Sequence, residues 1–288
     1  MLNHLRPWVL GHAPICAPIL TALRDRSPRH LDPLDPAALP FFHLVNAGNQ
    51  LAYGGLGMPA WVQLDCCTLP SAMIGLAAPR DRLPEALLRD LIAQVERRFG
   101  ADAADAARRW PGPVPVSEYC ATPTWTPGTV VGFSLYALLP GMGLGARTKA
   151  LALTGYGCDH QIGLAQYDNR AVRAHAALGP LELLHPRAWP HDHPDRTFVY
   201  RLTIDPDRLD AILAGGPPTN REPPDGALLV PLAPEPLAER LDALTQRRGP
   251  LAIVWPGLTR DGAHLVVRPL SEAPAPPPAR RAGPTSSG

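Results

Sequence analysis

The chain has 288 residues, with 27 Lys and Arg against 26 Asp and Glu, so its formal net charge is +1 at pH 7 with neutral histidines. A nucleic-acid-binding protein usually carries a basic surplus, and this balance argues against that class. The length is enough for one large domain or two ordinary domains, each with its own core. No apolar run reaches the roughly 20 residues that a membrane span needs. His12 and several prolines interrupt the apolar N-terminus, which therefore does not resemble a secretory signal.

The five cysteines indicate neither a disulfide framework nor a zinc site. Their number is odd, two are adjacent, and no C-x-x-C spacing occurs. They are Cys16, Cys66, Cys67, Cys120 and Cys158. We therefore expect a soluble protein of a reducing cytoplasm, and the many prolines, alanines and arginines are typical of GC-rich bacterial coding.

The N-terminal part is expected to open with a helix-containing segment, Met1–Arg26, and a proline-broken linker, Ser27–Pro40. β-Branched and aromatic residues between turn signals then predict three strands. These are Phe41–Tyr53, Ala60–Cys67 and Ala72–Ala77. Two helices should follow: Pro84–Phe99, whose leucines recur at helical spacing, and the alanine-rich Asp102–Trp110.

Strands and helices alternate through the following residues. The expected strands are Val114–Thr122, Thr129–Leu139, Gln161–Tyr167 and Thr197–Ile204. The expected helices are Leu144–Tyr156, Arg170–Leu178 and Pro206–Leu213. After a Pro/Gly-rich linker, Gly215–Asp225, a small strand–helix–strand–strand appendix is predicted from Ala227–Val230, Pro234–Gln246, Ala252–Trp255 and His264–Val267.

This alternation predicts an α/β (or α+β) fold with a mixed central sheet flanked by helices and a small C-terminal βαββ appendix. The expected divisions of the chain are 1–40, 41–112, 113–214, 215–270 and 271–288. Residues 41–112 could be a degenerate repeat of the segment that follows them. The last division is rich in Pro, Ala and Arg, so it should not bury a core and is expected to be disordered.

The most informative segment is a glycine-rich turn between a predicted strand and a predicted helix. Gly141, Gly143 and Gly145 alternate with other residues just where that helix begins. Free N–H groups and the helix dipole at such a position favour phosphate. By itself a G-x-G-x-G pattern is weak evidence. A dinucleotide fold fits less well, because the spaced third glycine is missing and no acidic residue ends the next strand.

The downstream residues extend this pattern into a resemblance to the GNAT superfamily of N-acetyltransferases. Val131–Leu139 is similar to that family's bulged strand, Pro140–Gly145 to its pyrophosphate loop, and Asn169–Gly179 to its asparagine helix. Ile162–Tyr167 and Thr197–Ile204 take the places of two further strands. The resemblance covers about residues 114–205 and implies acetyl-CoA, or another acyl-CoA, as co-substrate. The cofactor-binding residues that it implies are Leu138, Leu139, Gly141, Met142, Gly143, Leu144, Gly145, Ala146, Arg147 and Asn169.

Three residues depart from the family pattern. Pro140 stands where the family prefers Gln or Arg, His175 where it often has a tyrosine, and Pro180 where it has an aromatic residue. Arg147 or Lys149 could supply the positive charge that Pro140 lacks. Asn169 also suits a plain helix N-cap.

Acyl transfer to an amine needs a base, an oxyanion donor and an acid for the leaving thiolate. The resemblance suggests a strand amide near Leu138 and Leu139 as the oxyanion donor and His175 as the acid. Glu118, on the preceding strand, is the preferred base, with Tyr156 and Tyr119 as secondary candidates. Glu118 and His175 are also compatible with purely structural positions.

Two other groups of residues offer competing chemistry. A histidine-rich loop contains His185, His191, Asp192, His193 and Asp195, but it lacks a complete ligand set, and no metal is expected. Cys66 or Cys67 could act as a nucleophile with His43 or His160 as base.

The expected function is acyl-CoA-dependent N-acyl transfer, most simply acetyl transfer to an amine of a small molecule or a peptide. No nucleic-acid or membrane partner is expected, and a homodimer is compatible with the sequence. Two alternatives stay open: a GNAT-like binding or regulatory module without catalysis, and a cysteine-dependent hydrolase or transferase.

Overall fold

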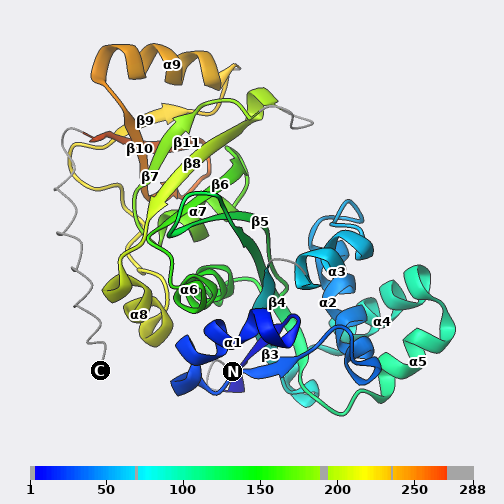
Figure 1. Ribbon diagram of the computed structural model, residues 1–288. Helices are drawn as coiled ribbons and strands as arrows, with labels where there is room; N and C mark the ends of the chain where they lie inside the picture. The colour runs from blue at the N-terminus through cyan, green and yellow to red at the C-terminus, as the bar shows by residue number, and fades with distance from the viewer. Residues whose placement is uncertain (1–3, 69–70, 189–193, 235, 271–288) are drawn as a thin grey trace, which may run out of the picture.

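The computed structural model describes residues 4–68, 71–188, 194–234 and 236–270, which form one large mixed sheet flanked by helices (Figure 1). The expected mixed α/β class is confirmed. The strands are β1 (Arg6–Leu10), β2 (Arg29–Leu31), β3 (Ala72–Ala78), β4 (Val114–Pro123), β5 (Thr129–Ala137), β6 (His160–Gln166), β7 (Leu181–His185), β8 (Thr197–Thr203), β9 (Leu228–Pro231), β10 (Leu251–Leu258) and β11 (His264–Pro269).

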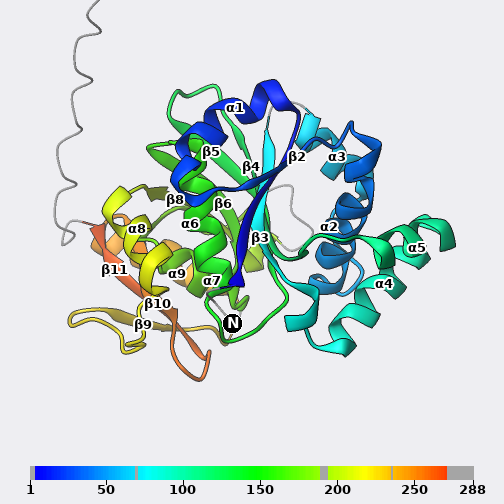
Figure 2. The same cartoon turned by 90° about the horizontal axis from the view of Figure 1, so that it is seen from below.

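The helices cover both faces of this sheet. They are α1 (Ala13–Ala22), α2 (Leu39–Ala52), α3 (Ala60–Thr68), α4 (Glu85–Phe99), α5 (Ala101–Arg109), α6 (Leu144–Tyr156), α7 (Ala171–Ala176), α8 (Pro206–Gly215) and α9 (Leu237–Arg248). Figure 2 shows α2 to α5 on one side of β3 and β4, with α1, α6 and α8 on the other side. The short 3-10 turns are Arg24–Arg26, Pro36–Ala38, Arg80–Arg82 and Pro194–Arg196.

The strand order is β2-β1-β3-β4-β5-β6-β8-β7-β10-β11-β9. The pairs β1·β2 and β5·β6 are parallel, and the other neighbours are antiparallel. The predicted appendix contributes β9, α9, β10 and β11 in the expected order, and its strands continue the same sheet.

The sheet opens between β5 and β6. Their parallel register holds only three residue pairs, Thr129 to Val131 of β5 against His160 to Ile162 of β6. β5 also carries a bulge, because Cys120 pairs with Ser134 and Ala121 with Gly132, which leaves Phe133 as the extra residue. The strand expected to be bulged therefore has its bulge, and beyond it β5 stays paired with β4 as far as Ala137 while its other edge has left β6.

Two predicted strands are wrong. Phe41–Tyr53 forms the helix α2, and Ala60–Cys67 forms the helix α3. α2 is buried almost all round, so its run of apolar and aromatic residues carries no clear helical period. In α3, Pro59 precedes the helix, and the buried residues Gln63 and Cys67 are four apart, which is helical spacing.

The sequence prediction also left out three strands. β1 lies inside the segment expected to be helical, β2 inside the expected linker, and β7 between α7 and the histidine-rich loop. α7 is shorter than expected. The tail 271–288, expected to be disordered, lies outside the described residues.

Candidate functional site

The glycine turn leads directly into α6. Gly141 and Gly143 have φ of 79° and 65°, the left-handed region that side chains disfavour, and Gly143 is the N-cap of the helix. Among the described residues, no acceptor receives a hydrogen bond from the backbone N–H groups of Leu144, Gly145 and Ala146. Three free donors at the positive end of a helix dipole are suited to an anion.

The segment after α8 closes over this helix end. A Cβ placed on Gly143 would lie 2.6 Å from Cδ of Pro217. The Arg147 guanidinium donates to the backbone oxygen of Leu213 at 2.9 Å, and its Nε atom is buried without a partner. Arg147 is therefore partly committed to α8, with the remaining donors next to the turn.

Other residues that the resemblance assigned to the cofactor have structural roles. The Leu138 N–H donates to the Val116 oxygen at 2.8 Å, so it is not a free oxyanion donor in this state. The Leu139 side chain is buried and that of Met142 is partly buried, both against the core. Asn169 Oδ1 accepts from the Ala171 N–H at 2.8 Å, which is a capping contact at the start of α7.

Glu118 lies on β4, fully buried, with its side chain toward α2. The Asn49 amide donates to its Oε2 atom at 3.4 Å, while Oε1 is buried without a partner. The same amide donates to the Ser134 hydroxyl at 2.8 Å. Burial raises the pKa of Glu118 to about 8, against the opposing effect of the Asn49 hydrogen bond. Glu118 is therefore a carboxyl group that can hold or release a proton near neutral pH.

His175 and Lys149 form a buried pair on the opposite face of the sheet. Lys149 Nζ lies 3.0 Å from His175 Nδ1 and 3.0 Å from the Tyr200 hydroxyl. Burial lowers the pKa of Lys149 well below its ordinary value, and burial together with Lys149 does the same to the pKa of His175. His175 is thus neutral at pH 7 and does not carry the imidazolium proton of a general acid. Burial favours the neutral form of Lys149, and its amine faces His175 and Tyr200.

Tyr156 ties the end of α6 to the sheet. Its hydroxyl lies 2.6 Å from the Ala72 oxygen and 2.7 Å from the Ala121 oxygen. Tyr119 faces α6, and its buried hydroxyl has no partner among the described residues. Glu118, His175 and Tyr156 each have a separate set of partners, so the described residues do not gather the three predicted catalytic groups into one cluster.

The sequence analysis missed Asn49 and Tyr53, which lie close to Glu118. The Tyr53 hydroxyl bonds both backbone groups of Leu135 on β5, and the Glu118 charge is one of the influences that raise the pKa of Tyr53, after burial. Asn49 and Tyr53 are four residues apart, a spacing that brings them close together on one side of a helix but leaves them far apart along a strand, so the strand predicted for Phe41–Tyr53 concealed their relation.

The cysteine alternative finds little support in the geometry. All five thiols are free. Cys66 hydrogen bonds to Cys120, which lowers the pKa of Cys66, and burial raises the pKa of Cys67 well above its ordinary value. His43 stacks on Phe99 with ring centroids 4.2 Å apart, and no described contact joins a histidine to either thiol of α3.

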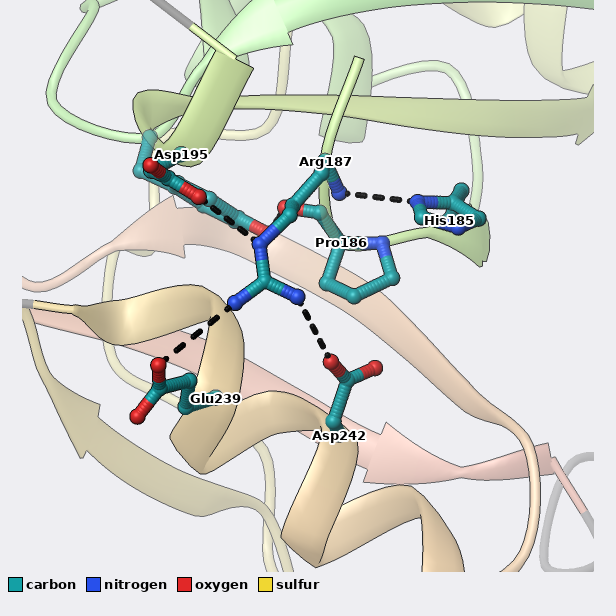
Figure 3. A network of polar contacts seen from close by, with 7 residues as sticks. His185, Pro186, Arg187, Asp195, Glu239 and Asp242 are labelled. Atoms are coloured by element: carbon teal, nitrogen blue, oxygen red, sulfur yellow. Dashed lines mark hydrogen bonds and ion pairs between the residues drawn. The ribbon is translucent and has the colours of Figure 1, made fainter. Parts of the chain in front are cut away.

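The described part of the histidine-rich loop is fixed by Arg187 (Figure 3). Its guanidinium contacts Asp195 at 2.7 Å, Asp242 at 3.2 Å and Glu239 at 3.8 Å. The backbone N–H of Arg187 donates to His185 Nδ1 at 3.1 Å. Asp242 and Glu239 belong to α9, so the loop is tied to the C-terminal part of the sheet. His191, Asp192 and His193 lie outside the described residues, and no group of ligands for a metal ion occurs within the described ones.

A hollow of about 730 Å³ lies apart from all these groups. Arg29, Asp32 and Trp110 are among its lining residues, and the Arg29 guanidinium lies 4.6 Å from the centre of the Trp110 ring. None of the predicted site residues lines it. Among the described helices, none is both long and apolar enough to cross a membrane.

Few known proteins are similar to this chain. No family model matches the chain, and no curated protein matches it. Among solved structures, it is similar to a chain in the crystal structure of the NatC complex bound to Gag peptide and CoA, with 12% sequence identity and a TM-score of 0.38. The similarity covers 60% of this chain and 96% of the other. At this level it assigns neither a ligand nor an activity to the chain.

Proposed function

We propose that this protein is an acyl-CoA-dependent N-acyltransferase that transfers an acyl group, most simply acetyl, to an amine of a small molecule or a peptide. The observation that carries the proposal is the arrangement around β5. A bulged strand parts from its parallel neighbour, ends in a glycine turn, and opens a helix whose first amides are free. This arrangement offers an anion site at one end of an open strand edge.

The turn fits the diphosphate of an acyl-CoA better than a neutral ligand. The N–H groups of Leu144, Gly145 and Ala146 provide donors, and Arg147 lies one helical turn after Gly143 with its guanidinium against Leu213 and Gly216. A bound acyl-CoA would supply a thioester, whose carbonyl carbon is activated toward an amine. Pro217, which lies against Gly143, would form part of the wall of the site.

Glu118 is the proposed base. An attacking amine must lose a proton, and only an ionised carboxylate can accept it. Because the pKa of Glu118 is about 8, its ionised fraction increases as the pH rises toward that value. Because Glu118 is fully buried, the proton would reach it through a water molecule.

The direct test follows thiol release from acetyl-CoA in the presence of a panel of amines and peptides with free N-termini. The proposal expects release that depends on an added amine and that Glu118→Gln strongly lowers. Release that is equally fast without any amine would contradict the proposal. No release with any member of the panel, while CoA still raises the melting temperature, would point to the second candidate instead.

That second candidate is a binding or regulatory module that takes CoA without acyl transfer. It is favoured by the separation of Glu118, His175 and Tyr156 and by the burial of His175, which lowers its pKa and leaves it without the proton of a general acid. The two candidates share the CoA site and differ only in turnover.

A further inference from the structure

The edge of β5 that faces β6 loses its partner strand after Val131. Among the described residues, no strand pairs with that edge between Gly132 and Ala137. Leu138 donates its N–H to Val116 on β4. Because alternate residues of a strand point their backbone groups to opposite sides, the groups of Leu135 point away from β4, toward the open side.

The hydroxyl of Tyr53 occupies this open position. It donates to the Leu135 oxygen at 2.9 Å and accepts from the Leu135 N–H at 3.3 Å. A neighbouring strand, or any extended chain with an amide, would satisfy the same donor and acceptor. One side-chain hydroxyl therefore takes the place of a chain on an unpaired strand edge.

Tyr53 also stands next to the buried base. Ser134 precedes Leu135, and its hydroxyl accepts the Asn49 amide that also reaches Glu118. The hydroxyl of Tyr53 lies close enough to Ser134 and Glu118 for both to influence its pKa, which burial raises overall. A group that replaced Tyr53 on β5 would lie next to Ser134, which Asn49 links to Glu118.

Tyr53 is poorly held by the rest of the fold. It follows the last residue of α2 and is 38% exposed. The next two residues, Gly54 and Gly55, have φ of 60° and 91°, and nothing lies within 4 Å of a Cβ built on either. Leu56 is 91% exposed. The segment that follows Tyr53 is therefore loosely packed, and the residue itself is partly open to solvent.

We propose that Tyr53 is a displaceable gate on the open edge of β5, where its hydroxyl holds the place of a secondary amide in the extended arm of CoA. The inference rests on the proposed function. When CoA binds, hydrogen bonds from its arm replace the two that Tyr53 forms with Leu135. Tyr53 therefore weakens CoA binding, and the route to Glu118 is exposed only when CoA is present.

The test compares the affinities of the full chain for CoA and for 3′-phosphoadenosine 5′-diphosphate, which keeps the diphosphate and lacks the arm, by calorimetry. Tyr53→Phe should bind CoA about tenfold more tightly than the wild type, a difference of about 1.4 kcal/mol, and 3′-phosphoadenosine 5′-diphosphate equally well. Tyr167→Phe is the matched control, because its hydroxyl bonds a single backbone oxygen, that of Pro186, away from this edge. It should change neither affinity.

Unchanged or weaker CoA binding in Tyr53→Phe would overturn the gate while leaving the proposed function in place. Absence of CoA binding in every variant would overturn the proposed function and the gate together. Hydrogen exchange gives a second readout: the Leu135 amide should exchange faster in ligand-free Tyr53→Phe than in the wild type and become protected in both when CoA is bound. An unprotected Leu135 amide in the CoA complexes would contradict the proposal.

Discussion

Lys149 offers a quantitative test of the buried polar cluster between α6, α7 and β8. The side chain is fully buried, with an exposed fraction of 0%, and it forms no ion pair within the described residues. Among the described residues, its hydrogen-bond partners are His175 and Tyr200. Burial therefore favours the neutral amine in the folded protein, and Lys149→Met removes the titrating group while keeping a similar shape.

The expected effect is a slope in pH. Burial lowers the pKa of Lys149 well below 10.5, so between the two pKa values the unfolded chain binds a proton that the folded chain does not. Stability then rises with pH, by about 1.4 kcal/mol for each pH unit. Lys149→Met lacks this contribution. The unfolding free energy of the variant minus that of the wild type should thus be about 1.4 kcal/mol larger at pH 8 than at pH 9.

Urea unfolding of both proteins at the two pH values measures this difference. The lost hydrogen bonds to His175 and Tyr200 lower the stability of the variant by a similar amount at both values, so they cancel in the comparison. Other titrating groups, such as Glu118, are present in both proteins and cancel as well. A difference that is equal at pH 8 and pH 9 would show that Lys149 stays charged in the folded protein and would refute the reasoning.

Two further predictions concern the base and the C-terminal part of the sheet. Acyl transfer by the wild type should increase as the pH rises through about 8, because Glu118 ionises there. The residual activity of Glu118→Gln should lack that increase in the same assay. An identical pH profile in both proteins would show that Glu118 is not the base. Arg187→Ala should accelerate hydrogen exchange in α9, because it deprives Glu239 and Asp242 of their shared partner, and α9 exchange equal to that of the wild type would show that the contacts in Figure 3 do not hold the helix.

The parts of the fold that were predicted correctly depend on local signals. A glycine with positive φ, a strand that ends in it and a helix that follows can each be inferred from neighbouring residues, and β5, the turn and α6 lie as expected. α2 was mistaken for a strand because a helix buried almost all round shows no polar face. That single error concealed Asn49 and Tyr53, whose importance depends on helical spacing.

Contacts between distant segments could not be predicted. His175 meets Lys149 only because α7 packs beside α6, and Lys149 adds to the burial that lowers the pKa of His175. Likewise, Arg147 suits a phosphate in the sequence, but its bond to Leu213 depends on the position of α8, 66 residues further along the chain. The strand–turn–helix motif was therefore easier to predict than the residues that would work around it.

The central claim is that the turn before α6 binds the diphosphate of CoA. Calorimetric titration of the full chain with acetyl-CoA tests it most directly, with Gly143→Asp as the perturbation and Gly157→Asp as the control. Gly157 has a similar φ of 58° at the other end of α6, with nothing within 4 Å of a Cβ. We predict saturable binding to the wild type and to Gly157→Asp, and none to Gly143→Asp, whose side chain would both press on Pro217 and bring a carboxylate to the bound anion. Equal affinity in all three proteins, or no binding to the wild type, would contradict the account.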